Sequence, residues 1–198
     1  KSGETELFIF FSGHGFASYD GKKLYLLAHD SDPDLLDPTA ISISQLYKKI
    51  FKLKTKNVTM FMDTSFSGSS TIKPTVQVPN NFTIFSSSKL NQISSGLKEA
   101  KHGIFSYYLM KGLEGNADLN QDKKITNGEL LAFMDENVSK KAAEIGRKQN
   151  PTLTGDPDKI LIINNKKTQI TIKETSQMQK VDEEFKIVKA KGKFKHLG

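Results

Sequence analysis

A histidine and a serine, each placed just after an apolar run, are the residues of this chain that best suit nucleophilic catalysis. His14 follows the apolar run at residues 6–11, and Ser65 follows the run at residues 57–62, 51 positions further along the chain. A nucleophile must lie within hydrogen-bond reach of its base, so the two usually occupy neighbouring strand ends rather than neighbouring sequence positions. The spacing therefore predicts a two-residue catalytic centre whose halves are joined by the fold.

Short apolar runs that stop at Gly and Ser clusters predict the strands that position these residues. Between them, apolar residues recur at helical spacing, in one case behind Ser44 as a possible N-cap. Strands that alternate with helices predict an α/β fold, with a mainly parallel sheet covered by helices on both faces. Such sheets carry their chemistry at the carboxyl ends of the strands. The expected strands are 6–11, 24–28, 57–62, 82–85 and 159–163, and the expected helices are 44–53, 104–113 and 129–145.

Charge and composition divide the 198 residues into a body at 1–165 and a Lys-rich linker, or the start of a further domain, at 166–198. The chain carries a net charge of +7, but the segment 166–198 alone holds 9 Lys and 4 acidic residues. The body is left with 20 basic and 18 acidic groups, so no nucleic-acid partner is expected. No apolar run reaches the roughly 20 residues of a membrane span, so no membrane partner is expected either, and a cytoplasmic location is favoured. Cysteine is absent, which excludes disulfides, Cys-type zinc sites and a thiol nucleophile in this sequence.

Two blocks of sequence resemble the catalytic blocks of the caspase-like peptidases, and are most similar to those of metacaspases and bacterial caspase-like proteins. They are Phe10 to Gly15 (FFSGHG) and Phe61 to Gly68 (FMDTSFSG), in the order and spacing of that family. The stretches 24–30 and 102–109 resemble the family's connecting strand and its late helix. The resemblance covers roughly residues 1–165 and implies a three-layer α/β/α peptidase domain that acts on a peptide or protein substrate.

The sequence departs from the family pattern in two respects. The family's first strands and helix precede the histidine strand, and they are absent here. We therefore expect this chain to be a fragment that is completed by an N-terminal fragment of the same protein or by another chain. The second departure is Ser65, which stands where the family has cysteine. Three explanations are open: an engineered Cys→Ser exchange that inactivates a cysteine endopeptidase, a natural pseudopeptidase that binds peptides as a scaffold, or a true serine variant.

The resemblance also implies roles for the residues around the dyad. His14 would act as general base and acid, residue 65 would carry the nucleophile, and the N–H groups of Gly15 and residue 65 would form the oxyanion hole. Asp63 and Ser12 would line the pocket for the residue before the cleaved bond. A carboxylate there selects Arg or Lys, as in metacaspase-like enzymes. The alternative for Asp63 is a cap on the turn that follows it.

An acidic loop at 118–129 matches a twelve-residue calcium loop and forms an insert in the predicted peptidase domain. Its flanks are helical in pattern, and Ile125 supplies the apolar anchor at position 8. Position 6 is Lys123 instead of glycine, so the sharp turn there requires a strained backbone. The alternative is a capped Asp/Asn turn without metal, and no organic cofactor is expected. The predicted Ca²⁺ ligands are Asp118, Asn120, Asp122, the carbonyl of Lys124, and Glu129.

Overall fold

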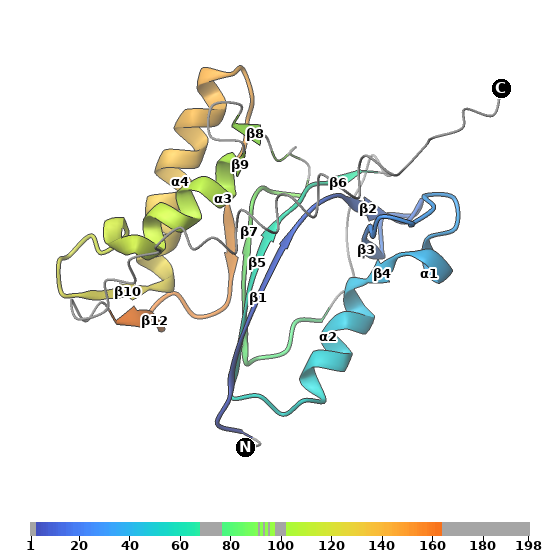
Figure 1. Cartoon of the computed structure of the whole chain (residues 1–198), viewed down its shortest axis with the longest axis horizontal. Coiled ribbons are helices and arrows are strands. Elements are labelled where there is room, and N and C mark those ends of the chain that lie inside the picture. Colours follow the sequence, from blue (N-terminus) through green and yellow to red (C-terminus); the bar gives the residue numbers. More distant parts are fainter. Residues whose placement is uncertain are drawn as a thin grey trace, which may run out of the picture. The chain divides into compact units, whose positions relative to one another are not determined.

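A computed structural model describes residues 3–67, 77–90, 92, 94, 96–97 and 102–163 of the chain (Figure 1). The predicted linker at 166–198 lies outside these residues, as does Gly68 at the end of the second motif. None of the described helices is long and apolar enough to cross a membrane.

The central sheet has four strands in the order β1-β5-β7-β11. Strands β1 (Glu6–Ser12), β5 (Asn57–Asp63) and β7 (Phe82–Ser86) run parallel, and β11 (Thr152–Thr154) is antiparallel to β7. The predicted mainly parallel sheet of an α/β fold is thereby confirmed. Strand β11 was not predicted, because its sequence Thr-Leu-Thr has a single apolar residue and gives no periodic signal.

Side chains that alternate along the strands divide the core between two helical layers, which lie on opposite sides of the sheet in Figure 1. Phe61 and Phe85 stack on each other and pack with helices α3 (Ile104–Lys111) and α4 (Asn127–Glu144). Met60 and Ile84, one position earlier on the same strands, pack on the other face with residues of helix α2 (Ile43–Phe51). This two-sided burial explains why β5 and β7 are mostly apolar on both faces instead of alternating, with one buried threonine in each, Thr59 and Thr83.

A second, smaller sheet carries the strands that follow the two catalytic motifs. Its order is β4-β3-β2-β6, and β2 pairs with β6 in parallel. Two further pairs of short strands, β8 with β9 and β10 with β12, are antiparallel. The remaining elements are β2 (Gly15–Ala17), β3 (Leu24–Leu26), α1 (Leu36–Thr39), β4 (Ile41–Ser42), β6 (Phe66–Ser67), β8 (Gly96–Leu97), β9 (His102–Gly103), the π-helix η2 (Gly112–Asn116), β10 (Lys124–Thr126) and β12 (Ile160–Ile163).

Some element boundaries differ from the predicted ones. Helix α2 begins at Ile43, so Ser42 and not Ser44 is the N-cap residue, and it makes no side-chain capping bond. The helix predicted to run to residue 113 ends at Lys111 and continues as the π-helical turn η2, where Gly115 has a φ of 121°. The strand predicted at 159–163 exists as β12, but it pairs with β10 outside the central sheet. The partner of a strand depends on residues far away in the sequence, and the local periodicity does not encode it.

Strand β1 forms the outer edge of the central sheet among the described residues. Its residues are alternately exposed and half-buried, and Phe8 and Phe10 are 53% and 56% exposed. Both lie on the side of Phe61, since Phe10 pairs in register with Phe61 itself. An edge strand with exposed aromatic side chains is a template for a further strand. The expectation of a completing fragment stays a prediction.

We predict that this edge drives self-association of the 198-residue chain. The exchange Phe10→Lys places a charge on the exposed strand and should shift the chain toward monomer in sedimentation velocity. Leu35→Lys is the matched control, because Leu35 is 56% exposed in a turn and should leave the sedimentation profile unchanged. Equal profiles for Phe10→Lys and the unaltered chain would contradict the role given to β1.

Candidate active site

Backbone pairing brings the two catalytic motifs together. Strands β1 and β5 pair in register to their last residues, where Ser12 lies opposite Asp63. Beyond the sheet, the N–H of Gly13 donates to the carbonyl of Asp63 at 3.2 Å, and the N–H of Gly15 donates to the carbonyl of Ser65 at 3.0 Å. His14 is thus held between two backbone bonds from its own motif to the serine motif.

The predicted catalytic and substrate-binding residues line one pocket of about 440 Å³. His14 is exposed at its rim, Ser65 is half-buried and Asp63 is buried. The lining therefore offers an imidazole and a hydroxyl, with a carboxyl group two residues before that hydroxyl. The predicted members of this lining are Ser12, His14, Gly15, Asp63 and Ser65.

Gly15 is needed for close packing behind the dyad. A Cβ at this position would lie 2.5 Å from the ring of Phe66, so no larger residue fits without a shift of that ring. Its N–H group, predicted to serve the oxyanion hole, donates to Ser65 in this structure. To bind an oxyanion, this N–H group would have to give up its bond to Ser65, so its role in the oxyanion hole stays a prediction.

Asp63 is 5% exposed, and serine hydroxyls hold its carboxylate. Ser94 Oγ donates to Oδ1 at 2.7 Å, while Ser106 donates to Oδ2 from both its backbone N–H, at 3.3 Å, and its hydroxyl. Gly103 leaves the room for this arrangement, since a Cβ there would collide with Oδ2. These donors lie 31 and 43 positions away in sequence, so they do not form the local turn cap that was the alternative for Asp63.

Sequence reasoning missed Ser94, Gly103 and Ser106. Gly103 and Ser106 lie inside the 102–109 stretch that carries the resemblance to a late helix, which was a usable signal. Ser94 stands in a run of polar residues and gives no signal of its own. Gln149, which is almost fully buried, also went unnoticed, although its Nε2 donates to the carbonyl of Ser87 at 3.0 Å and to Ser94 Oγ at 3.4 Å.

A buried serine fixes the backbone directly before the nucleophile position. Ser87 Oγ accepts from the N–H of Thr64 at 3.1 Å and donates to the carbonyl of Thr64 at 2.9 Å. Ser87 follows β7, the strand next to β5, and its own N–H donates to the carbonyl of Met62 at 2.9 Å. The peptide groups on both sides of Asp63 are therefore tied to the neighbouring strand, which orients residues 63–65 as one unit.

The acidic loop has its predicted outline but no preassembled metal cage. Asp118 accepts from the N–H groups of Asp122 and Lys123 at 3.1 and 3.0 Å, and Ile125 is fully buried at the start of the β10–β12 pair. Lys123 has a φ of 66°, which is the left-handed backbone expected at position 6. Within the described residues, no three His, Cys, Asp or Glu side chains form a group that could hold a metal ion.

Glu129, the predicted twelfth ligand, is occupied by helix capping. Its Oε2 accepts from both the N–H and the hydroxyl of Thr126 at 2.9 Å, which forms a capping box at the start of α4. Its Oε1 is buried and has no hydrogen-bond partner among the residues that the structure describes. The oxygen ligands suit a hard cation such as Ca²⁺, and Glu129 would have to turn toward the loop to complete such a site.

Comparison with known proteins places the whole described region in one family. The family model of the caspase domain matches residues 1–169. Among solved structures, a protein from Geobacter sulfurreducens is similar at a TM-score of 0.53 and 16% identity, covering 79% of this chain and 68% of its own. Caspase-1 from Spodoptera frugiperda is similar at a TM-score of 0.52 and 18% identity, covering 83% of this chain and 65% of its own. No curated protein matches the sequence.

We propose that the acidic loop binds one Ca²⁺ and that the ion stabilises the fold. Binding to the native state alone adds about 2.7 kcal/mol at a hundredfold excess over Kd. Millimolar calcium should therefore raise the thermal unfolding temperature, and Asp118→Asn together with Glu129→Gln should remove most of the rise. Asp135→Asn, an exchange on the same helix outside the loop, is the control. An unchanged unfolding temperature together with no calorimetric binding signal would show that the loop is a capped turn that binds no calcium.

Proposed function

The chain belongs to the caspase-domain family, and on that premise we propose that its thiol-bearing form is an endopeptidase that cleaves after Arg or Lys. One observation carries the proposal. A buried carboxylate, Asp63, lines the same pocket as His14 and residue 65, the two positions that would perform the cleavage.

The reaction requires a proton to leave the nucleophile and later to reach the leaving amine. With cysteine at position 65, His14 would take the thiol proton, and the thiolate would attack the scissile carbonyl. Collapse of the tetrahedral intermediate breaks the C–N bond as His14 returns the proton to the amine. Water, deprotonated by His14, then hydrolyses the acyl-enzyme and releases the acid. A serine hydroxyl ionises far less readily than a thiol, so Ser65 in this dyad should be nearly inert.

Preference for a basic residue follows from the charge and the setting of Asp63. The two hydroxyls that donate to its carboxylate fix the direction of its oxygens. A substrate cation that enters the pocket gains a charge-assisted contact in surroundings of low dielectric. An acidic side chain would face like-charge repulsion there. Ser12, opposite Asp63 in the β1–β5 register, adds a second oxygen at the pocket wall.

The second candidate function is a natural pseudopeptidase that binds peptides in the same pocket without cleaving them. The serine at position 65 supports it, because a hydroxyl in a site built for a thiol should be nearly inert, while the other predicted residues still line the pocket. The codon at position 65 of the native gene separates the two: a cysteine codon supports the peptidase, and a serine codon supports the scaffold.

We expect Ser65→Cys to create peptidase activity in the complete protein, and His14→Ala in that background to abolish it. The assay measures release of a fluorophore from peptides with Arg, Lys or Asp before the cleaved bond. Ser67→Cys is the matched control, since it places a thiol in the same pocket at a position that the dyad does not use. Failure of Ser65→Cys to cleave any of these peptides would overturn the peptidase proposal.

Asp63→Asn in the active background should lower kcat/KM for Arg and Lys peptides by the equivalent of about 2–5 kcal/mol, as for one partner of a buried charge pair. Ser106→Ala should lower kcat/KM by less, the equivalent of about 1.5–3 kcal/mol, because it removes one hydrogen bond to the carboxylate and keeps the carboxylate itself. Both losses should fall mainly on basic substrates. A peptide library in which Asp is preferred before the cleaved bond would contradict the pocket assignment.

A further inference from the structure

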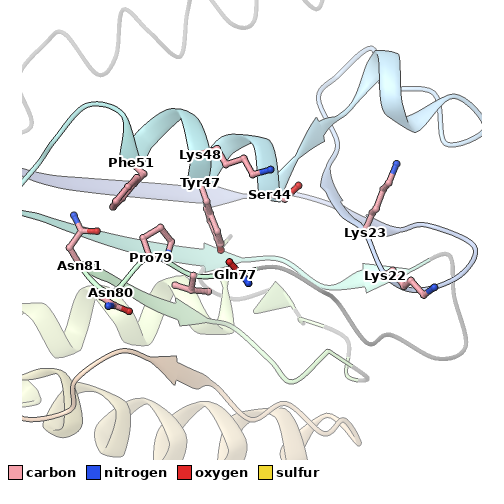
Figure 2. A pocket seen from close by; sticks show the side chains of 11 residues that line it. Lys22, Lys23, Ser44, Tyr47, Lys48, Phe51, Gln77, Pro79, Asn80 and Asn81 are labelled. Carbon is pink, nitrogen blue, oxygen red and sulfur yellow. The ribbon is translucent and has the colours of Figure 1, made fainter.

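A second pocket, of about 860 Å³, lies beside helix α2 and is larger than the pocket of His14 (Figure 2). Its walls come from three segments: the face of α2 with Tyr47, Lys48 and Phe51, the stretch 77–81 ahead of β7, and Lys22 and Lys23 ahead of β3. It shares none of its described lining residues with the first pocket. The proposed peptidase chemistry therefore assigns no ligand to this second pocket.

All the charged residues of the described lining are cationic. It includes three lysines and no Asp or Glu. Lys48 has no ion-pair partner within the described part of the chain, and Figure 2 shows its side chain at the pocket side of α2. Lys22 and Lys23 pair with Asp20 at 3.9 Å and with Asp37 at 3.2 Å, and all four side chains are more than half exposed. Exposed pairs contribute about 0–1 kcal/mol, so an anion in the pocket can compete for both lysines at little cost.

The rest of the lining combines apolar surface with groups that both donate and accept hydrogen bonds. Phe51, which is 57% exposed, lies beside Pro79 and the Asn81 carboxamide in Figure 2. The Nδ2 of Asn81 donates to the carbonyl of Thr55 at 3.1 Å, while its Oδ1 is buried and finds no partner within the described ranges. Burial raises the pKa of Tyr47 to about 12, so its hydroxyl stays protonated and able to donate.

These features distinguish between classes of anion. Inorganic phosphate or pyrophosphate offers acceptors only and leaves the apolar surface and the exposed acceptors of Gln77 and Asn80 unused. A nucleotide base would need an open ring face, but Tyr47 lies edge-on to Phe82 at 5.5 Å and is buried, which leaves Phe51 alone. An extended peptide supplies N–H and C=O groups along its length, and its side chains alternate between two sides at intervals of about 3.3 Å. Acidic and apolar residues in alternation match the lysines and the Phe51–Pro79 surface.

We propose that this pocket, the α2 pocket, binds an extended acidic peptide segment of a partner protein. Carboxylates of the segment pair with Lys48, Lys22 and Lys23, apolar side chains cover Phe51 and Pro79, and the exposed carboxamides of Gln77 and Asn80 bond to the peptide backbone. The interaction is independent of the residue at position 65, so the failure of the peptidase proposal would leave it intact.

The test is fluorescence anisotropy of the 198-residue chain with a labelled seven-residue peptide of alternating Glu and Leu. Lys48→Ala and Phe51→Ser should each weaken binding by about tenfold, the effect of losing one contact of about 1.4 kcal/mol. Lys49→Ala is the matched control: Lys49 is the next residue of α2, exposed and equally charged, but it does not line the pocket. It should change the affinity by less than about twofold, because it alters only the screened long-range field. The same peptide with Gln in place of Glu should bind at least about tenfold more weakly.

Three results would overturn the proposal. Equal losses from Lys48→Ala and Lys49→Ala would show that the peptide responds to the net charge of α2 and not to the pocket. Full displacement of the peptide by an equimolar amount of pyrophosphate or ATP would show a site for a compact anion. Absence of an anisotropy change with the unaltered chain at millimolar concentration would show that the pocket takes no acidic peptide.

Discussion

The parallel pairing of β1 with β5 is the constraint on which the candidate active site depends. In a parallel pair the carboxyl ends of both strands emerge at the same edge, so the His14 motif and the Ser65 motif leave the sheet side by side. The pairing does not stop at the sheet. Backbone bonds from Gly13 to Asp63 and from Gly15 to Ser65 carry the register into the parallel β2–β6 pair. A slip of one residue would turn every side chain of β1 to the opposite face and separate the motifs.

The burial of Asp63 is the second constraint, and it shapes elements that are distant in sequence. A carboxylate removed from water is costly unless hydrogen bonds replace its hydration. Here those bonds come from Ser94 and from Ser106 near the start of α3, and Gly103 clears the space for them. Gln149 connects the same region to Ser87, which braces the backbone of Thr64. One connected set of polar groups thus supports both the buried carboxyl group at the pocket wall and the backbone before position 65.

The two pockets differ in electrostatic character in a way that local charge explains. Near His14 the buried ionisable group is the carboxyl of Asp63, for which we propose a cationic substrate residue. Beside α2 the described lining holds lysines and no carboxyl group, for which we propose an anionic ligand. The near neutrality of the body at 1–165, with 20 basic and 18 acidic groups, conceals this separation. Net charge alone therefore says little about what the folded surface binds.

The sequence by itself determined the α/β class, the three parallel strands of the central sheet and the residues at their ends. It could do so because buried strands and their polar termini leave a local pattern of apolar runs, Gly and Ser. The helices on both faces were also readable, with errors of a few residues where Ser42 replaced Ser44 as the cap and where η2 followed Lys111. The family followed from two motifs whose order and spacing survive in the sequence.

Only the tertiary structure decided which distant groups meet. The segment with Gly103 and Ser106 carries a motif signal, but nothing in that signal shows that both residues contact Asp63. Ser94 and Gln149, which complete the contacts around Asp63, lie in segments with no periodic or motif signal. The same holds for β11, for the pairing of β12 with β10 and for the α2 pocket, whose lysines are scattered over the sequence from Lys22 to Lys48. Local pattern reflects which face of an element is buried. The contacts between elements depend on register and packing across the whole domain, and the pattern does not record them.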